Sequence, residues 1–560
     1  MAFQMSPGVN SSEIDLTTVV PAVSTTVGGF AGNFAWGPIE EITSTPNEIQ
    51  LSTVFSKPDA NTYGQFFTAA NFLQYGNNLL VVRAANTGTK NAGTSGGSYQ
   101  IKNQSDYLQN YSAGSGSDVW FAKYAGALGN NIGVSIADAN TFASWTSSGL
   151  NYKGYFDSAP STTPFASTKG GSYDEMHVIV YDTTGKITGV ANTVLERFGY
   201  VSKASDAKNS DGSTNYYKDV VNSRSKYIWW SKHHSDGTNW GNTASGIAFA
   251  NLASFRTLTL SGGTDVAPTT GDINRAYDLF GNGDSINVNL LMTGPQSGVV
   301  VPNYVVALAE TRKDCMVFIS PQQSDVVNNV GNEVTAITAY RNQLTSSSYA
   351  FMDSGWKYQY DKYNDTYRWL PLNGDIAGLA ARTDSDRDPW FSIAGSNRGI
   401  IKNVVKLAWN PKKSDRDSIY TIGVNPVVTF PGEGTYLYGD KTMLSRPSAF
   451  DRINVRRLFI VLEEAISKAA RSTMFEFNDE FTRAQFVNLV EPFLRDVKGR
   501  RGIYDFKVVC DTTNNTPEVI DGNSFVGDIY IKPARSINYI QLNFVAVRTG
   551  VSFQEVVGQF

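Results

Sequence analysis

The sequence contains one match to the nucleophile pattern Gly-x-Ser-x-Gly, at Gly93-Thr-Ser95-Gly-Gly97. In serine hydrolases of this pattern the serine lies on a strained turn between a strand and a helix, which exposes its hydroxyl for attack. Here the match lies in a segment of Gly, Ser, Thr and Asn, and no helical pattern of apolar residues follows it. We therefore interpret the match as a coincidence of composition.

A run of alternating acids, Asp384-Ser-Asp386-Arg-Asp388, resembles the start of a calcium-binding EF-hand loop. Such a loop needs Gly at its sixth position for the sharp turn and Glu at its twelfth position as a ligand. The sixth position is Pro389, and the twelfth position has no Glu. We interpret the three acids as part of a surface turn.

The remaining candidates for metal or nucleotide chemistry also lack part of their pattern. His233 and His234 are adjacent and would point to opposite faces of an extended segment, with no Cys or Glu nearby to complete a zinc site, and His177 stands alone. Gly281-Asn-Gly283 begins a dinucleotide-binding pattern, but a strand pattern follows it instead of a helix. No GxxxxGK[ST] phosphate loop occurs. The sequence therefore predicts no cofactor and no metal ion, and it favours a protein that is not an enzyme.

The composition favours a large multidomain protein with a weakly charged surface. Its 560 residues are 18% charged, with 47 Lys and Arg against 51 Asp and Glu, whereas a typical soluble domain is about 25% charged. At about 150 residues per domain, the length predicts three or four domains. The near-neutral charge argues against a nucleic-acid partner, whose binding depends on neutralising phosphates. Two cysteines, Cys315 and Cys510, cannot form a disulfide framework, which fits a reducing cytoplasm.

Neither export nor membrane insertion is expected. The first eight residues have neither the basic nor the apolar region of a signal peptide. The most apolar stretch, Gly298 to Ala309, contains Pro302 and is shorter than the 18 or more residues of a membrane-spanning helix.

Both ends of the chain read as extended arms. Residues 1–20 contain β-branched residues in loose alternation with polar ones, and residues 551–560 form a short apolar tail. An unpaired strand exposes its backbone donors and acceptors, so it either aggregates or adds to another sheet. The residues alone leave open whether each arm packs on its own chain or on another one.

Residues 21–98 and 251–430 carry the patterns of a central α/β domain. The first part ends in an almost wholly apolar strand, Asn78 to Arg83, of the kind that is buried on both faces. The second part alternates strands and helices, which predicts a partly parallel sheet. Its expected elements are strands at Arg256–Leu260, Val288–Met292 and Cys315–Ile319 and helices at Ile273–Phe280 and Val301–Lys313.

Residues 99–250 predict a separate β-rich domain, because short aromatic and β-branched runs alternate with patches of Gly, Ser, Thr and Asn. The polar segment before it, Asn86–Ser98, cannot supply a packed core, so we expect an exposed loop or a domain boundary there. The expected strands are Val119–Tyr124, Gly133–Ile136 and His177–Tyr181.

Residues 431–550 predict a small α+β domain. A long amphipathic helix with Asn454 as its N-cap opens the domain. A second helix begins after Asn478, with Asp479 in its first turn, where an acid favours the helix dipole. Strands are expected at Phe506–Cys510, Val526–Ile531 and Asn538–Val547.

Several segments, in order along the chain, resemble the contractile tail sheath proteins of bacteriophages and related injection machines. Ala122–Asn130 is close to the sheath signature A-K-Y-P-G-x-x-G-N, with Ala125 in place of the usual Pro. Leu260–Asp265 resembles the family's Leu-x-Gly-Gly-x-Asp turn. Further segments that match in order and spacing are Ser6–Val9, Glu13–Asp15, Gly28–Pro38, Ala377–Asp384, Asn454–Arg457 and Phe475–Asn478.

The resemblance implies a structural subunit that assembles with copies of itself. In this family, subunits stack as six-membered rings around a rigid tail tube, and the metastable extended helix contracts to drive the tube through the host envelope. The implied partners are further copies of the chain, the tail tube protein, and baseplate and tail terminator proteins, with no direct nucleic-acid partner. The implied location is the virion tail, after assembly in the host cytoplasm.

The resemblance also gives the arms a role, because each arm in this family adds a strand to the C-terminal sheet of a neighbouring subunit. The implied fold is a mixed α/β and α+β multidomain protein, with a central α/β domain, a β-rich outward-facing insertion and a C-terminal α+β domain completed by strand exchange. The residues expected to pair with neighbours are Val9, Ile14, Leu16, Val19, Val551, Phe553 and Val556.

The inward-facing helix of the family corresponds to the second helix of the C-terminal domain. Its basic end is expected to meet acidic groups on the tube, and the alternative is a solvated helix end that the dipole stabilises. The residues concerned are Arg495, Lys498, Arg500 and Arg501.

Two other classes of protein compete with a sheath subunit. A secreted β-rich polysaccharide hydrolase would need an export signal and a clustered acid pair, and neither is visible. A host-binding virion surface protein would use the aromatic-rich residues 99–250 as a receptor-binding module.

Overall fold

The computed structural model describes residues 24–542 apart from 115, 148 and 149. The chain forms two compact units. The larger unit contains the described residues up to Pro389 and Ile393–Lys468, and the smaller unit contains Trp390–Ser392 and the described residues from Ala469 onwards.

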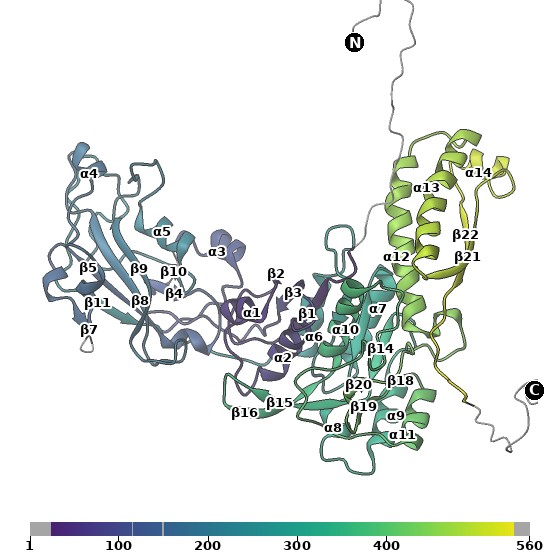
Figure 1. Cartoon of the computed structure of the whole chain (residues 1–560). Coiled ribbons are helices and arrows are strands. Elements are labelled where there is room, and N and C mark those ends of the chain that lie inside the picture. Colours follow the sequence, from purple (N-terminus) through teal and green to yellow (C-terminus); the bar gives the residue numbers. More distant parts are fainter. Residues whose placement is uncertain (1–23, 115, 148–149, 543–560) are drawn as a thin grey trace, which may run out of the picture. The chain divides into compact units, whose positions relative to one another are not determined.

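A mostly parallel seven-stranded sheet forms the centre of the larger unit (Figure 1). The strand order is β18-β14-β13-β12-β1-β3-β2, and only the edge strand β2 runs antiparallel to its neighbour. Strands from two distant stretches of the chain therefore share one sheet, as the α/β pattern predicts. The strands are β1 (Gly28–Gly32), β2 (Ile42–Thr45), β3 (Leu79–Arg83), β12 (Leu290–Met292), β13 (Met316–Ile319), β14 (Ala350–Asp353) and β18 (Val424–Asn425).

Both faces of this sheet are buried, which explains why its strands are almost wholly apolar. On β13, Met316 and Phe318 pack into one core, whereas Val317 and Ile319 pack into the other. Helices α2 and α10 lie over the first core, and α6 and α7 lie over the second. The helices of this region are α1 (Glu48–Phe55), α2 (Tyr63–Phe72), α6 (Thr270–Asp278), α7 (Val300–Arg312), α8 (Gln323–Val326), α9 (Glu333–Gln343), α10 (Asn373–Asp386) and α11 (Lys413–Thr421).

Two small antiparallel sheets complete the central region. One has the order β16-β15-β17 and the other is a hairpin of β19 and β20. Their strands are β15 (Trp356–Asp361), β16 (Thr366–Pro371), β17 (Lys406–Leu407), β19 (Val427–Phe430) and β20 (Gly434–Leu437).

The segment between β3 and α6 is rich in antiparallel strands, as predicted. A four-stranded sheet has the order β11-β5-β8-β9, and β4 pairs with β10 beside it. Three short helices, α3 (Gln104–Asn110), α4 (Pro164–Thr168) and α5 (Tyr217–Arg224), connect the strands. The strands are β4 (Trp120–Ala122), β5 (Ile132–Asp138), β6 (Thr146–Ser147), β7 (Leu150–Asn151), β8 (Glu175–Asp182), β9 (Thr193–Ser202), β10 (Ile228–Trp230) and β11 (Arg256–Thr259).

The smaller unit is an α+β arrangement in which α13 packs along β21 of a two-stranded antiparallel sheet (Figure 1). The long helix α12 (Ile453–Ala470) precedes it in the chain. The elements of the smaller unit are α13 (Glu480–Gly499), β21 (Ile503–Val509), α14 (Pro517–Asp521) and β22 (Asp528–Pro533).

The two helix starts predicted near the C-terminus are each shifted by about one residue. Helix α12 begins at Ile453, so Asn454 is not its N-cap; the extended residue Arg452 precedes the helix instead. Asp479 is the N-cap of α13, where its carboxylate accepts a hydrogen bond from the backbone N–H of Thr482 at 2.8 Å. A polar residue next to a helix start can occupy either side of the boundary.

Two other expectations are wrong in part. The third C-terminal strand is absent from the described part of Asn538–Val547, because residues 538–542 are not in a strand. In the polar segment Asn86–Ser98, Asn91, Ala92 and Gly93 are buried. The Asn91 amide donates to the carbonyl of Ala122 at 2.8 Å. Because its polar groups are hydrogen-bonded in this way, the segment can be buried although it has few apolar side chains.

Candidate assembly surfaces

The structure places the four basic residues of the predicted tube contact together at the end of α13. Arg495 and Lys498 lie in the last turns of the helix, Arg500 is its C-cap, and Arg501 follows in a left-handed conformation with φ of 67°. The indole Nε1 of Trp390 donates to the carbonyl of Arg500 at 3.1 Å, which fixes the chain where it leaves the helix. We call this cluster, Arg495 to Arg501, the basic end of α13.

Acids of the same unit neutralise most of this charge. Each of three cations has an acidic neighbour, and Arg501 has no ion pair with any described residue, so four positive and three negative charges leave about one net positive charge. The Lys498 ammonium holds the pKa of Asp505 below its ordinary value through a direct hydrogen bond. The ion pairs are Arg495 Nη2–Glu491 Oε2 (3.6 Å), Lys498 Nζ–Asp505 Oδ1 (2.9 Å) and Arg500 Nη1–Asp496 Oδ2 (3.6 Å).

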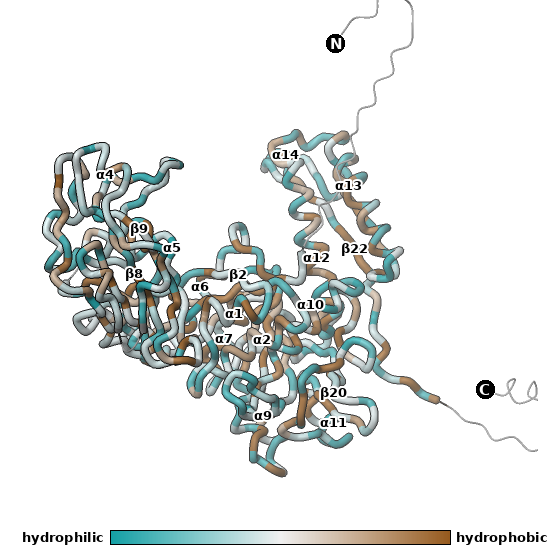
Figure 2. The backbone as a smooth tube through the Cα atoms, turned by 60° about the vertical axis from the view of Figure 1, so that its left-hand side comes forward, coloured by the Kyte–Doolittle hydropathy of each residue, from teal (hydrophilic) through white to brown (hydrophobic). Residues whose placement is uncertain are grey.

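The sheet of the smaller unit is a second candidate surface, because it is open. Strands β21 and β22 pair with each other and with no other described strand, so each has an outer edge of backbone groups without a strand partner among the described residues. Tyr504 and Tyr530 are mostly exposed on these strands. The described chain beyond β22 mixes polar and apolar residues (Figure 2), and its exposed large hydrophobic residues are Ile537, Tyr539, Ile540 and Leu542.

The residues predicted to exchange strands between subunits lie outside the described part of the chain. They are Val9, Ile14, Leu16, Val19, Val551, Phe553 and Val556. Strand exchange therefore stays a prediction, and the open sheet is the surface that could receive such strands.

Ser95 lies in an irregular turn, where its polar groups bond to the backbone and to an aspartate. Its hydroxyl donates to the carbonyl of Ser117 at 3.1 Å, and its backbone N–H donates to the Asp118 carboxylate. The residues after it form neither a helix nor a strand. The geometry of a nucleophile elbow is therefore not formed here.

The alternating acids are not a surface turn, contrary to expectation. Asp384 and Asp386 belong to the last turn of α10. The carboxylate of Asp384 is almost fully buried in an ion pair with the Arg457 guanidinium, and burial raises its pKa. Because both partners belong to segments that resemble sheath proteins, this pair joins two of those segments inside the larger unit.

The histidines serve packing and hydrogen bonding. His177 is buried in β8, where it stacks on Phe156 with ring centroids 4.0 Å apart, and burial lowers its pKa. His233 Nδ1 lies 2.6 Å from the Tyr217 hydroxyl. Among the described residues, no group of His, Cys, Asp and Glu side chains could hold a metal ion. In the same part of the chain, no helix is long and apolar enough to cross a membrane.

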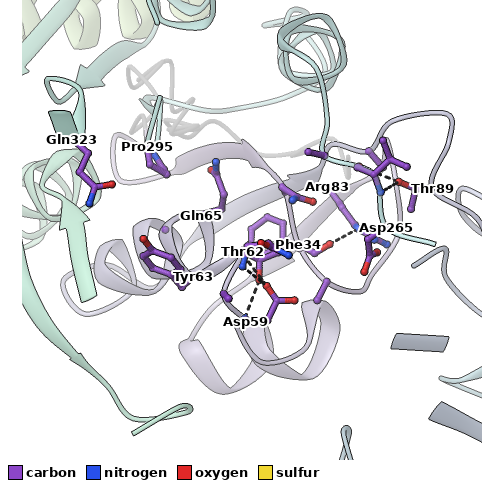
Figure 3. Close-up of a pocket in the computed structure, with 18 of the residues that line it drawn as sticks. Phe34, Asp59, Thr62, Tyr63, Gln65, Arg83, Thr89, Asp265, Pro295 and Gln323 are labelled. Carbon is purple, nitrogen blue, oxygen red and sulfur yellow. Dashed lines mark hydrogen bonds between the residues drawn. The ribbon is translucent and has the colours of Figure 1, made fainter. Parts of the chain in front are cut away.

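A buried arginine joins two of the sheath-like segments, and the sequence analysis missed it. Arg83, at the end of β3, is 1% exposed and lies beside a cavity of about 560 Å³ with a mixed polar and apolar lining (Figure 3). Its guanidinium donates to the carbonyls of Phe34 (2.8 Å), Gly37 (2.9 Å) and Ala125 (2.8 Å). Burial lowers its pKa to about 10, so it remains charged at neutral pH.

Asp265, the last residue of the Leu260–Asp265 turn, also lines this cavity, and Figure 3 shows it beside Arg83. Burial raises its pKa, and the neighbouring Arg83 partly offsets that effect. A side-chain carbon at Gly126 would lie 2.9 Å from an Asp265 carboxylate oxygen and 3.1 Å from the carbonyl of Ala35, so only Gly fits there. Three segments that resemble sheath proteins, Gly28–Pro38, Ala122–Asn130 and Leu260–Asp265, thus pack together beside Arg83.

Two buried lysine–aspartate pairs were missed as well. Lys357 Nζ lies 2.8 Å from an Asp375 oxygen, and Lys203 Nζ lies 3.1 Å from an Asp138 oxygen, with all four side chains fully buried. Each partner lies far from the other in the sequence, so no local spacing could have revealed the pairs. Charges of this kind are buried only when they are paired and hydrogen-bonded.

Known proteins similar to this chain are phage tail sheath proteins. Residues 298–443 match the phage tail sheath protein central domain, and residues 445–546 match the phage tail sheath C-terminal domain. The chain is 35% identical to the tail sheath protein of Enterobacteria phage T4, over 99% of each chain. It is 34% identical to the tail sheath protein of Vibrio phage KVP40, over 99% of this chain and 100% of the relative.

Solved structures of sheath proteins share the fold. The sheath tail protein of Desulfitobacterium hafniense superposes with a TM-score of 0.53 at 11% identity, over 90% of this chain and 94% of that one. The contracted helical sheath protein of the anti-feeding prophage gives a TM-score of 0.51 at 12% identity, over 97% and 99%. With relatives at 34–35% identity over its full length, the chain belongs to the tail sheath protein family of bacteriophages and is a structural subunit of a contractile tail sheath.

Proposed function

We propose that the chain polymerises as stacked six-membered rings around a tail tube and contracts to drive that tube through the host envelope. Its partners are then further copies of itself, the tube protein, and baseplate and tail terminator proteins. It assembles in the host cytoplasm, and it acts without enzymatic chemistry.

The open two-stranded sheet of the smaller unit is the observation that carries this proposal. A two-stranded sheet alone is marginally stable, and its free edges invite further strands. The arms at residues 1–20 and 551–560 are of suitable length and composition to supply strands from neighbouring copies. Main-chain pairing tolerates changes in side-chain packing, so subunits can rotate without separating.

The energy for contraction is stored in the lattice at assembly. No nucleotide is required, in keeping with the missing phosphate loop in the sequence. The drive is the difference in buried interface between two packings of the same subunit, summed over many copies. The formal net charge of −4 keeps like-charge repulsion between stacked copies small.

Electron microscopy of the purified chain tests the proposal. Hollow tubes with six-fold symmetry support a sheath, and stable monomers with hydrolytic activity or receptor binding would instead support the competing classes. A chain without residues 1–20 is expected to fold but not to polymerise, because the neighbouring sheets lose a strand. The control is the full-length chain with Val190→Ser, a polar change at an exposed residue of the larger unit. Normal polymerisation of the truncated chain would contradict strand exchange.

A further inference from the structure

The winding of the central sheet reverses direction between β1 and β12. From β1 the chain adds β3 on one side, and it later adds β12 on the other side of β1, with β13 and β14 continuing in that second direction. These neighbouring strands are all parallel to one another. In open α/β sheets, ligands bind outside the carboxyl ends of the strands at such a switch point.

The cavity of Figure 3 lies at this place, because its lining follows the ends of the strands. Asn33 directly follows β1, and Pro295 lies three residues after β12. A second cavity of about 700 Å³ adjoins the first, of about 560 Å³, and we call the two the switch-point cleft. Each volume is in the range of about 300–1,000 Å³ that is usual for small-molecule sites. Residues that line both cavities include Asn33, Asn61, Gln65, Ala267, Pro295 and Gln323.

The Gln65 side chain brings an unpaired amide oxygen to the switch point. Its Oε1 is buried and accepts no hydrogen bond from any residue that the structure describes. A side-chain carbon at Gly32, the last residue of β1, would lie 2.8 Å from this oxygen, and one at Gly294, two residues after β12, would lie 2.9 Å from it. The amide therefore lies between the ends of the two strands. Its last torsion is a soft one, so it can turn to a ligand in the cleft and recover the missing hydrogen bond.

The charges around the cleft favour a neutral ligand. Among the described residues, no Lys, Arg, Asp or Glu lines the larger cavity. The smaller cavity has Asp59 and Asp265 against Arg83, whose three nitrogen atoms already donate to backbone carbonyls. Phosphate and carboxylate ligands are held by free Arg or Lys side chains. The cleft therefore lacks the groups that an anionic ligand requires.

Amide side chains supply most of the polar groups of the lining. They come from four places, namely the end of β1, the start of α2, and the segments after β12 and β13. Each amide offers one acceptor and two donors, and a sugar hydroxyl both donates and accepts. Amides from several directions therefore match a ring of hydroxyl groups. The amide residues are Asn33, Asn61, Gln65, Gln296, Gln323 and Asn328.

We infer that the switch-point cleft binds a small neutral sugar, with the Gln65 amide as its central hydrogen-bonding group. A peptide fits this place less well, because extended peptides bind along a free sheet edge or in an apolar groove. The edges of this sheet are β2 and β18, whereas the cleft lies at the strand ends between them. The inference does not depend on the proposed assembly, since every lining residue belongs to the larger unit of one chain.

Saturation-transfer NMR on the unassembled full-length chain tests the inference. Glucose, galactose, mannose and N-acetylglucosamine are offered one at a time, and at least one is expected to bind and to raise the melting temperature with its concentration. Gln65→Leu is expected to weaken this binding at least ten-fold. The melting temperature of the free variant is expected to stay the same or rise, because an unpaired buried acceptor is removed.

A second variant and a control keep the result independent of Gln65. Ala267→Trp places a large ring at an exposed residue that lines both cavities and is expected to abolish sugar binding without a change in the core. Gln109→Leu, at an exposed residue of α3, is the matched control and is expected to bind the sugar unchanged.

Four outcomes would overturn the inference. They are no signal from any of the sugars, equal sugar binding by Ala267→Trp and the unsubstituted chain, binding of inorganic phosphate in place of the sugars, and binding of a synthetic peptide of residues 551–560 that Ala267→Trp prevents. The last outcome would make the cleft a peptide site. Because all measurements use the unassembled chain, a failure to form tubes would count against the proposed function alone.

Discussion

The guanidinium Nη2 of Arg83 donates a hydrogen bond of 2.8 Å to the carbonyl of Ala125. This bond ties β3 of the central sheet to the loop between β4 and β5 of the β-rich segment. The same guanidinium also donates to the carbonyls of Phe34 and Gly37, so one buried charge binds three carbonyls in two backbone segments. The β-rich segment and the central region are therefore joined by this side chain, in addition to contacts such as the Lys102–Glu40 ion pair.

Arg83→Lys is expected to destabilise the larger unit by about 2–4 kcal/mol. A lysine keeps the charge but cannot reach three carbonyls in fixed directions, which leaves buried acceptors unsatisfied. The midpoint of urea unfolding of the unassembled chain measures the change. Arg275→Lys is the matched control, because Arg275 is 45% exposed and its ion pairs are worth about 0–1 kcal/mol. Equal midpoints for the two variants would contradict the role given to Arg83.

The sequence predicted the central sheet well because its strands are buried on both faces. Continuous apolar runs such as Leu79–Arg83 and Met316–Ile319 carry that signal in every residue. Arg83 itself escaped notice because a single Arg at a strand end has no periodicity. Its importance depends on three carbonyls that only the tertiary fold brings together.

The C-terminal region shows a different limit. Its helices follow from apolar stripes, but residues 538–542 alternate in the same way as a strand and are not in one. A strand needs a partner strand, and alternation shows only the preference of a segment for pairing. The positive charge of the basic end of α13 was visible in the sequence. Its partial neutralisation by Asp505 depends on the packing of β21 against α13, which the sequence does not show.

The buried carboxyl of Asp353 is expected to make the stability of the larger unit depend on pH. Its Oδ2 accepts from the Ser320 hydroxyl at 2.6 Å and its Oδ1 from the N–H of Gly355 at 2.9 Å, and burial raises its pKa to about 8. The native state then holds a proton that the unfolded state releases above pH of about 4. Stability contributed by this group is therefore complete at low pH and falls by up to about 1.4 kcal/mol per pH unit as the pH rises toward 8.

Asp353→Asn is expected to remove this component, since an amide does not titrate. The free energy of unfolding of both chains is measured in urea between pH 5.5 and 8.5, a range that spans the raised pKa of about 8. The two plots of this free energy against pH are expected to differ in slope. The asparagine variant gains stability relative to the unsubstituted chain as the pH rises. Parallel pH profiles would show that Asp353 is ionised in the native state.

Lys357→Met is expected to destabilise the larger unit by about 3–5 kcal/mol, because it leaves the Asp375 carboxylate buried without its cation. The Tyr75 hydroxyl also donates to Asp375 at 3.0 Å and is not enough to replace an ammonium. The double variant Lys357→Met with Asp375→Asn removes both charges and keeps an acceptor for Tyr75. It is expected to recover more than half of the loss in urea unfolding. If the loss in the double variant instead equalled the sum of the losses in Lys357→Met and Asp375→Asn alone, the two side chains would not be coupled.

Reversing charges at the basic end of α13 tests the proposed contact with the tube. Arg495→Glu with Lys498→Glu changes the net charge of this surface by about four units and is expected to abolish sheath assembly on tubes, because acidic tube groups would then be repelled. Arg501→Glu alone is expected to have the largest effect of the single variants, because no described acid neutralises Arg501. Cosedimentation of the chain with purified tubes measures both changes.

The matched control for this reversal is Lys186→Glu with Arg224→Glu, two exposed cations of the β-rich segment. It changes the total charge by the same amount and is expected to leave tube binding intact. Raising the salt concentration is expected to weaken tube binding of the unsubstituted chain, since exposed ion pairs are screened within about 8–10 Å at physiological ionic strength. If the reversed chain bound tubes as well as the control did, α13 would end in a solvated basic turn whose only electrostatic partners are its own helix dipole and the acids beside it.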